Sequence, residues 1–340
     1  GQRTEQGPYV VDQGQEVRSH AHGHIGIIGI SDPYEPWFWG PNNPALGDPD
    51  LANADVLEYA KSIGAFPTYV HPGIPVGDPF ATPAESFSSL DDINELILQD
   101  GIGLEVISGW DDPMGNVQLW YRLLNIGKQV PGISGTDGWV DFYRTPALGT
   151  ARNFVPVENG NSDFDRVLAA TAAGRGFLST GPALLFRMDD DLRPGDVVAS
   201  GAREWSLTLA STSEVDRVEL VVNGQVVKTL DGVKAGETRV LSGTVALPEG
   251  GWVAARAFNT QPLDDPWPAM LKHPFAHSMP IWIGSKGSTD PQAYASSAAD
   301  LLRALEAIEQ SARSAYGDRP MDKLYGRYEL ARESLDASGQ

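Results

Sequence analysis

The chain of 340 residues contains no cysteine, so a disulfide framework and a thiolate metal site are both excluded, and thiol usage says nothing about the redox compartment. Any metal site must therefore use histidine, aspartate or glutamate. Basic residues are also scarce, since 25 Lys and Arg stand against 45 Asp and Glu and give a formal net charge of −20. Nucleic-acid binding needs clustered Lys and Arg. We therefore expect no nucleic-acid partner, and the acidity most simply serves solubility.

Long apolar runs are absent as well. No run approaches the ~20 residues that span a bilayer, and the N-terminus lacks a basic segment followed by an apolar one. We therefore expect no membrane insertion. The first residue is Gly1 and not Met, so we expect further sequence upstream, and an acidic chain without cysteine is compatible with export. These features favour a periplasmic or secreted location.

Potential metal ligands are most concentrated in residues 16–24. This stretch holds one carboxylate and three of the six histidines, His20, His22 and His24, ahead of the apolar run 25–30, which is typical of a buried strand. Imidazole and carboxylate together suit zinc, manganese or iron better than calcium. Strand spacing would place the three histidines on one face, although a turn carrying exposed histidines fits the same residues.

Three units of helix, glycine and strand follow. The helical patterns cover 55–63, 91–99 and 117–126, and the apolar segments after them cover 65–70, 103–108 and 130–134. Such units predict an α/β domain in which parallel strands are covered by helices. Glu16, His71 and Asp137 each end a predicted strand, so we expect them to converge at the carboxyl edge. Taken singly, His71 could be an ordinary strand-end residue and Asp137 part of a turn.

The remaining chain divides into a bridging segment, a β-region and a helical end. Arg144, Arg152 and Arg175 in the bridge could orient an anionic or carbonyl-bearing substrate, or could tie loops to backbone carbonyls. Strand-like alternation follows, with a hairpin signal at Asn223-Gly224, and predicts a β-sandwich. The final amphipathic helices could dock on the protein body or form a dimer interface. The predicted divisions are 1–182, 183–286 and 287–340.

Several short motifs occur in a recognisable order. They are Gly14-Gln15-Glu16, Gly23-His24, Val70-His71-Pro72-Gly73, Gly135-Thr136-Asp137, segments 149–153 and 174–182, Asn223-Gly224 and Phe275-Ala276-His277-Ser278. This order resembles the carbaryl-hydrolase-like (CehA/McbA) branch of the PHP metallohydrolases over nearly the whole chain. The resemblance implies a distorted α/β barrel with two or three divalent metal ions at its carboxyl rim, followed by a β-sandwich and here by C-terminal helices.

The resemblance also assigns residues. It implies that Glu16 is a bridging carboxylate, that His24 and His71 are imidazole ligands, and that Asp137 is a carboxylate near the last strand. Two departures stand out. The opening His-x-His and Asp-His of the family have no counterpart before Glu16, and Trp139 occupies the place of the last imidazole, where it would contact substrate.

Two explanations fit these departures. The barrel is N-terminally incomplete because its first strands lie upstream of Gly1, in which case an upstream fragment is a partner, or the chain is a metal-poor relative. His20 and His22 could replace the missing ligands in part.

Together these observations predict a metal-dependent hydrolase of a small-molecule ester, carbamate, amide or phosphoester. One or more zinc, manganese or iron ions would activate a water, which Glu16 or Asp137 would position or deprotonate. The alternative is a non-catalytic carbohydrate-binding or assembly protein, with Trp37-Phe38-Trp39 and Trp267 available for sugar stacking, for a homo-oligomer or for another subunit.

Overall fold

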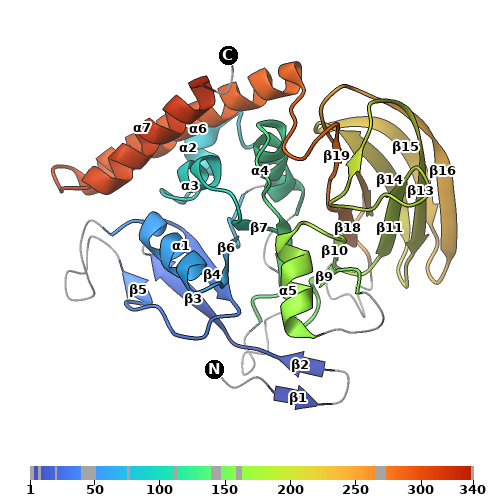
Figure 1. Ribbon diagram of the computed structural model, residues 1–340, viewed down its shortest axis with the longest axis horizontal. Helices are drawn as coiled ribbons and strands as arrows, with labels where there is room; N and C mark the ends of the chain where they lie inside the picture. The colour runs from blue at the N-terminus through green and yellow to red at the C-terminus, as the bar shows by residue number, and fades with distance from the viewer. Residues whose placement is uncertain are drawn as a thin grey trace.

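The computed structural model (Figure 1) describes residues 4–6, 9–19, 21–39, 51–74, 77–109, 113–138, 147–157, 163–264 and 273–337. It has three parts: a six-stranded sheet with helices, a β-sandwich, and a pair of long C-terminal helices. The chain begins with a small hairpin, β1 (Thr4–Gln6) and β2 (Tyr9–Val11).

The six-stranded sheet holds the candidate ligands. Its strands are β3 (Gly14–Ser19), β4 (His24–Ile28), β5 (Phe38–Trp39), β6 (Phe66–Val70), β7 (Gly103–Ser108) and β8 (Gly132–Gly135). Their order is β5-β3-β4-β6-β7-β8. β4 is antiparallel to both β3 and β6, whereas β6, β7 and β8 are parallel to one another and β5 is parallel to β3.

Helices form between the strands. They are α1 (Asn53–Ser62), α2 (Pro83–Ser86), α3 (Ile93–Leu98), α4 (Pro113–Asn125) and α5 (Phe164–Ala172). Of these, α1, α3 and α4 lie where the apolar spacing predicts them. Gly64, Gly101 and Gly127 follow α1, α3 and α4 with φ of 73°, 75° and 84°, a conformation that glycine adopts without a steric cost. The predicted helix–glycine–strand units and their parallel strands are confirmed.

The predicted α/β barrel is wrong. β3 and β4 are an antiparallel pair, and within the described residues β5 and β8 form the two open edges of the sheet. The physical reason is the short connection between Ser19 and His24, because a parallel neighbour requires a crossover of a dozen or more residues. Most of the other strands belong to two further sheets. The fold is therefore dominated by β-structure, with a half-barrel-like sheet in its first part.

The β-sandwich consists of a large and a small sheet. The strands are β9 (Arg152–Phe154), β10 (Phe177–Ser179), β11 (Ala183–Met188), β12 (Val197–Val198), β13 (Gly201–Ala210), β14 (Val215–Val222), β15 (Gln225–Val233), β16 (Thr238–Leu247), β17 (Gly251–Phe258), β18 (Phe275–Ser278) and β19 (Ile281–Ile283). The small sheet has the order β11-β13-β16, and the other strands form the large one. Leu184, Leu207, Leu220 and Val253 from both sheets share one buried core. The predicted sandwich is thus confirmed, and β9 and β10 of the bridging segment join it.

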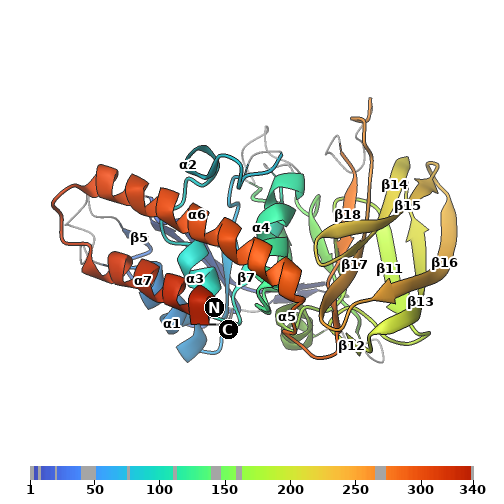
Figure 2. The same cartoon turned by 90° about the horizontal axis from the view of Figure 1, so that it is seen from above.

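The C-terminal helices α6 (Pro291–Tyr316) and α7 (Asp322–Ala337) lie side by side across the helical layer, as Figure 2 shows. Leu301, Leu305 and Ile308 of α6 and Leu324 and Tyr328 of α7 are buried in the core of the first part. The apolar faces therefore dock on the protein body. None of the helices that the structure describes is both long and apolar enough to cross a membrane.

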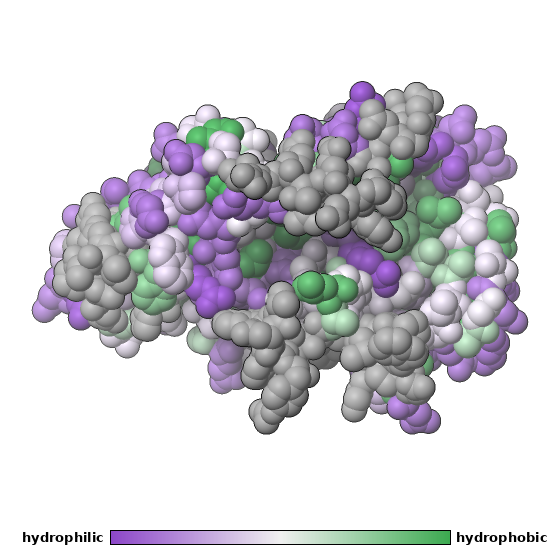
Figure 3. Space-filling view, turned by 90° about the horizontal axis from the view of Figure 1, so that it is seen from below, coloured by the Kyte–Doolittle hydropathy of each residue, from purple (hydrophilic) through white to green (hydrophobic). Residues whose placement is uncertain are grey.

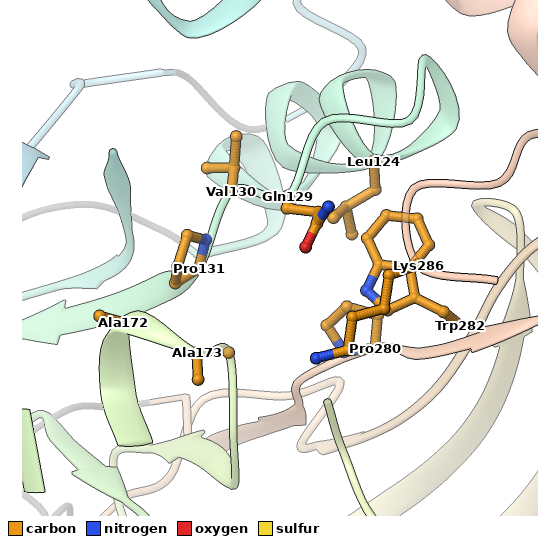
Figure 4. Close-up of a pocket in the computed structure, with 10 residues that line it drawn as sticks. Leu124, Gln129, Val130, Pro131, Ala172, Ala173, Pro280, Trp282 and Lys286 are labelled. Carbon is orange, nitrogen blue, oxygen red and sulfur yellow. The ribbon is translucent and has the colours of Figure 1, made fainter. Parts of the chain in front are cut away.

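The first part and the sandwich meet in a packed junction. The ring of Tyr121 on α4 lies 4.9 Å from that of Trp252 on β17 and 5.6 Å from that of His277 on β18, measured between centroids. A cavity of about 90 Å³ lies beside this junction. Figure 4 shows Val130 and Pro131 on one side of the cavity and Trp282 and Lys286 on the other. The hydrophobic core of the first part therefore continues into the large sheet.

Candidate metal centre

Strand directions bring three predicted ligands to one edge of the six-stranded sheet. Because β3 and β6 run oppositely to β4, the ends of β3 and β6 lie beside the start of β4. Glu16 lies within β3, His24 begins β4, and His71 directly follows β6. The sequence had predicted that Glu16 ends a strand. In the structure Glu16 instead lies inside β3.

Glu16 is the centre of the group. Its Oε1 lies 2.9 Å from Nδ1 of His24 and 3.1 Å from Nε2 of His71. The two imidazole rings are 5.0 Å apart and nearly perpendicular. One ligand atom from each of the three residues lies within 4.8 Å of the other two, and all three side chains are half-buried. This Glu/His/His group could hold a metal ion.

One nitrogen in the group is unsatisfied. Although Nδ1 of His24 is close to Glu16, the contact does not have hydrogen-bond geometry, and this buried atom has no hydrogen-bond partner among the described residues. A buried polar atom without a partner costs about 1–3 kcal/mol. A cation bound between the imidazoles and the carboxylate would satisfy the nitrogen lone pair, so the residues present fit a divalent transition metal.

The electrostatics of the group keep its carboxylate ionised. Partial burial by itself would raise the pKa of Glu16, but contacts with His24, His71 and Arg18 outweigh burial and lower that pKa well below the ordinary value. Burial would lower the pKa of His71, but the hydrogen bond with Glu16 and the charges of Glu105 and Asp137 raise it overall. The site therefore attracts positive charge.

Glu105 supports the group and was not among the residues predicted from the sequence. It is buried on β7, and its Oε2 accepts a hydrogen bond of 2.5 Å from the backbone N–H of His71. This bond holds His71 where the backbone has a φ of 33°. A Cβ at Gly135 on β8 would overlap Oε1 of Glu105, so glycine there leaves room for the carboxylate. The available signal was a glutamate in an otherwise apolar strand.

Arg18 was also missed. Its Nη2 lies 2.9 Å from Oε2 of Glu16, whereas the two histidines contact the other carboxylate oxygen, Oε1. Residues two apart on a strand project to the same face, and Glu16 and Arg18 have that spacing. This spacing was the signal that could have identified the pair.

Asp137 does not join the group. It is half-buried after β8 with a φ of 47°, and its charge contributes to raising the pKa of His71. The carboxylate is therefore near the group, although it offers no ligand atom within the spacing of the other three. Trp139, the predicted substrate contact, lies outside the described residues.

His22 is a core residue. Its side chain is buried, with Nδ1 3.3 Å from Asp91 Oδ2 and Nε2 2.9 Å from the hydroxyl of Tyr316 on α6. The predicted shared face with His24 is wrong because residues 21–23 bend, with Gly23 at a φ of 93°, and strand alternation does not apply. His20 lies outside the described residues.

The predicted substrate-binding arginines are dispersed. Arg175 places Nη1 2.8 Å from Oδ1 of Asp196, so it ties a loop to the sandwich. Arg152 is exposed on β9, with its guanidinium 5.7 Å from the centre of the Phe154 ring. Arg144 lies outside the described residues. The indole of Trp37 is exposed, and Trp267 is not among the described residues.

Comparisons with known proteins identify no family. No protein-family model matches the sequence, and no curated protein matches it. A lytic polysaccharide monooxygenase from Jonesia denitrificans, solved by neutron crystallography, matches with a TM-score of 0.20 and 13% identity. The match covers 40% of this chain and 78% of that one. At this TM-score the likeness supports no conclusion about fold or function.

Proposed function

We propose that the chain is a metal-dependent hydrolase whose centre is the group of Glu16, His24 and His71. The observation that carries the proposal is the convergence of one ligand atom each from Glu16, His24 and His71 within 4.8 Å of one another, with Nδ1 of His24 buried and without a hydrogen-bond partner among the described residues. Two imidazoles and a carboxylate are a ligand set of catalytic zinc sites, which keep one position open for water or substrate. The motif order of the CehA/McbA branch supports the same reaction class.

The metal supplies the chemistry that the side chains lack. A bound divalent ion lowers the pKa of a water from 15.7 to about 7 and polarises a substrate C=O or P=O group. The substrate class is accordingly a small-molecule ester, carbamate, amide or phosphoester. Zinc, manganese and iron all suit the donor set.

The side chains have separate roles in this proposal. Glu16 supplies the anionic ligand, and its contacts with His24, His71 and Arg18 keep it ionised. His24 and His71 supply neutral nitrogen ligands, and Glu105 orients His71 through its backbone N–H. Asp137 is close to His71 but outside the ligand group. A carboxylate oxygen of Asp137 is therefore the proposed acceptor for the proton of the attacking water.

Metal content and hydrolysis test the proposal together. Protein purified without chelator should contain about one equivalent of transition metal, and an anomalous-scattering map should place it between Glu16, His24 and His71. The protein should hydrolyse at least one of four chromogenic substrates: an ester, a carbamate, an anilide and a phosphodiester. A chelator should remove the activity, and the metal should restore it.

Variants test whether metal binding and activity depend on this group and not on a histidine elsewhere in the chain. Glu16→Gln and His71→Ala should lose both metal and activity, whereas His273→Ala, a change at an exposed histidine outside the group, should keep both. Less than about a tenth of an equivalent of metal, with no gain on reconstitution, would overturn the proposal. That result would favour the non-catalytic binding or assembly protein instead.

A further inference from the structure

A second candidate site lies on the β-sandwich. A pocket of about 380 Å³ opens where β9 and β10 meet β11, one of the two edge strands of the small sheet. Phe154, Phe177, Leu185 and Pro194 form much of its wall. The rings of Phe154 and Phe177 stack with centroids 4.7 Å apart and planes 7° apart. The pocket therefore presents a flat aromatic surface beside an aliphatic one.

The apolar wall is exposed to solvent. Leu184 and Phe186 of β11 point into the sandwich core, so Leu185 between them points to the opposite face and is 55% exposed. Phe154 is 38% exposed. Apolar residues are also seen over the sandwich on the face in Figure 3. A large apolar side chain on the outer face of an edge strand contributes little to the core, and a cluster of them marks a binding surface.

Positive charge surrounds this wall. Arg187 and Arg193 line the pocket, and the guanidinium of Arg152 lies 5.7 Å from the centre of the Phe154 ring. Within the part of the chain that the structure describes, the one carboxylate near the Arg187 guanidinium belongs to the exposed Asp191, at 4.0 Å. Among the described residues no carboxylate pairs with Arg152 or Arg193. In a chain with a net charge of −20, three arginines around one apolar pocket are complementary to an anion.

We propose that this pocket binds a small amphiphilic carboxylate. The apolar body of the ligand packs on Phe154 and Leu185, and its carboxylate faces Arg193. A neutral apolar ligand would leave the arginines without a counter-charge, and a highly charged anion would leave the apolar wall uncovered. The volume lies toward the lower end of the range of roughly 300–1,000 Å³ for small-molecule sites, which fits one ring with a short acidic chain.

The pocket is separate from the metal centre. It shares no residue with the group of Glu16, His24 and His71. On β9, Asn153 accepts a hydrogen bond of 2.7 Å from the backbone N–H of Ser134, whereas Phe154 lines the pocket. Binding here therefore does not depend on the proposed hydrolase activity.

Isothermal titration of the full chain with 4-phenylbutyrate and with 4-phenylbutan-1-ol tests the proposal, because the two probes share an apolar body and differ in charge. The carboxylate should bind about tenfold more tightly than the alcohol. Leu185→Ser should weaken both probes about tenfold. Arg193→Ala should weaken only the carboxylate, by about threefold to tenfold.

Matched variants control for surface changes. Val240→Ser removes another exposed apolar side chain, and Arg239→Ala removes another exposed arginine, so both should bind the probes like the wild type. Glu16→Gln should bind the carboxylate unchanged, which separates this pocket from a carboxylate bound to metal. Equal affinities of the two probes, no saturable binding, or unchanged binding by Leu185→Ser with a native thermal melt would each overturn the proposal.

Discussion

Nε2 of His71 lies 3.1 Å from Oε1 of Glu16, although the two residues are 55 positions apart in the sequence. The contact exists because β4 lies between β3 and β6 and is antiparallel to both. Glu105, from the next strand, then holds the backbone of His71. Three strands of one sheet, β3, β4 and β6, thus bring the three candidate ligands together, and a fourth strand, β7, supplies the supporting Glu105.

Metal binding should stabilise the folded protein. A ligand that binds only the native state at about 100 times its Kd adds roughly 2.7 kcal/mol to the free energy of unfolding. The melting temperature of chelator-treated protein should therefore rise when zinc or manganese is added. Glu16→Gln should abolish the rise, whereas Glu204→Gln, at an exposed glutamate, should retain it. A rise of the same size in Glu16→Gln would show that the metal binds elsewhere.

Gly135→Ala should damage the centre without touching a ligand. The added methyl group would overlap the carboxylate of the buried Glu105, and overpacking of this kind costs about 1–3 kcal/mol. Because Glu105 supports His71, the metal affinity should fall as well, about tenfold or more. Urea unfolding and metal titration measure the two effects. Gly326→Ala is the control, since it lies in α7 with nothing within 4 Å of the added carbon, and it should leave metal binding unchanged.

His277 should make the protein sensitive to acid. Burial lowers the pKa of its imidazole from 6.5 to about 3. Nε2 accepts a hydrogen bond from the hydroxyl of Tyr121, and Nδ1 donates one to the carbonyl of Ser278, so the neutral ring is the form that fits. The unfolded chain takes up a proton first as the pH falls. The stability due to His277 is therefore complete above about pH 6.5 and is lost as the pH falls toward 3.

Urea unfolding at pH 7.5 and pH 5 measures this loss. His277→Gln should be less stable than the wild type at pH 7.5 but should lose less on acidification. His273→Gln, at an exposed histidine, should keep the slope of the wild type. The assignment fails if His277→Gln and the wild type lose equal stability between the two pH values.

The dependence of stability on pH that is due to Asp92 should have the opposite sign to that of His277. Burial raises the pKa of its carboxyl from 3.8 to about 7. The unfolded chain therefore releases this proton at a lower pH than the folded one, and stability decreases as the pH rises from about 4 toward 7. Oδ1 of Asp92 accepts the N–H of Ile93 at the start of α3, and an asparagine keeps that acceptor. Asp92→Asn should hence remove this decrease in unfolding measurements between pH 5 and 8, and an unchanged decrease would contradict the assignment.

Local features of the fold were predictable from the sequence. Gly64 and Gly127 follow the ends of α1 and α4 in the left-handed conformation, and Asn223-Gly224 forms a two-residue turn with φ of 50° and 81° between β14 and β15. These features depend on backbone preferences and apolar periodicity within a few residues. Strand directions were predicted less well from the sequence. The predicted barrel placed β3 and β4 in a parallel arrangement, which their short connection does not permit.

At the candidate metal centre, too, the sequence predicted the ligand types but not which histidines meet. By itself the sequence determined that imidazole and carboxylate ligands precede a buried strand, and that residues following β6 and β8 lie near the same edge. Only the tertiary structure decided that His24 reaches Glu16 and His71 while His22, two residues earlier, bonds to Asp91 and Tyr316 in the core. Pairing between distant strands and helices sets which face each side chain meets, and that pairing is not encoded in the spacing of residues along one segment.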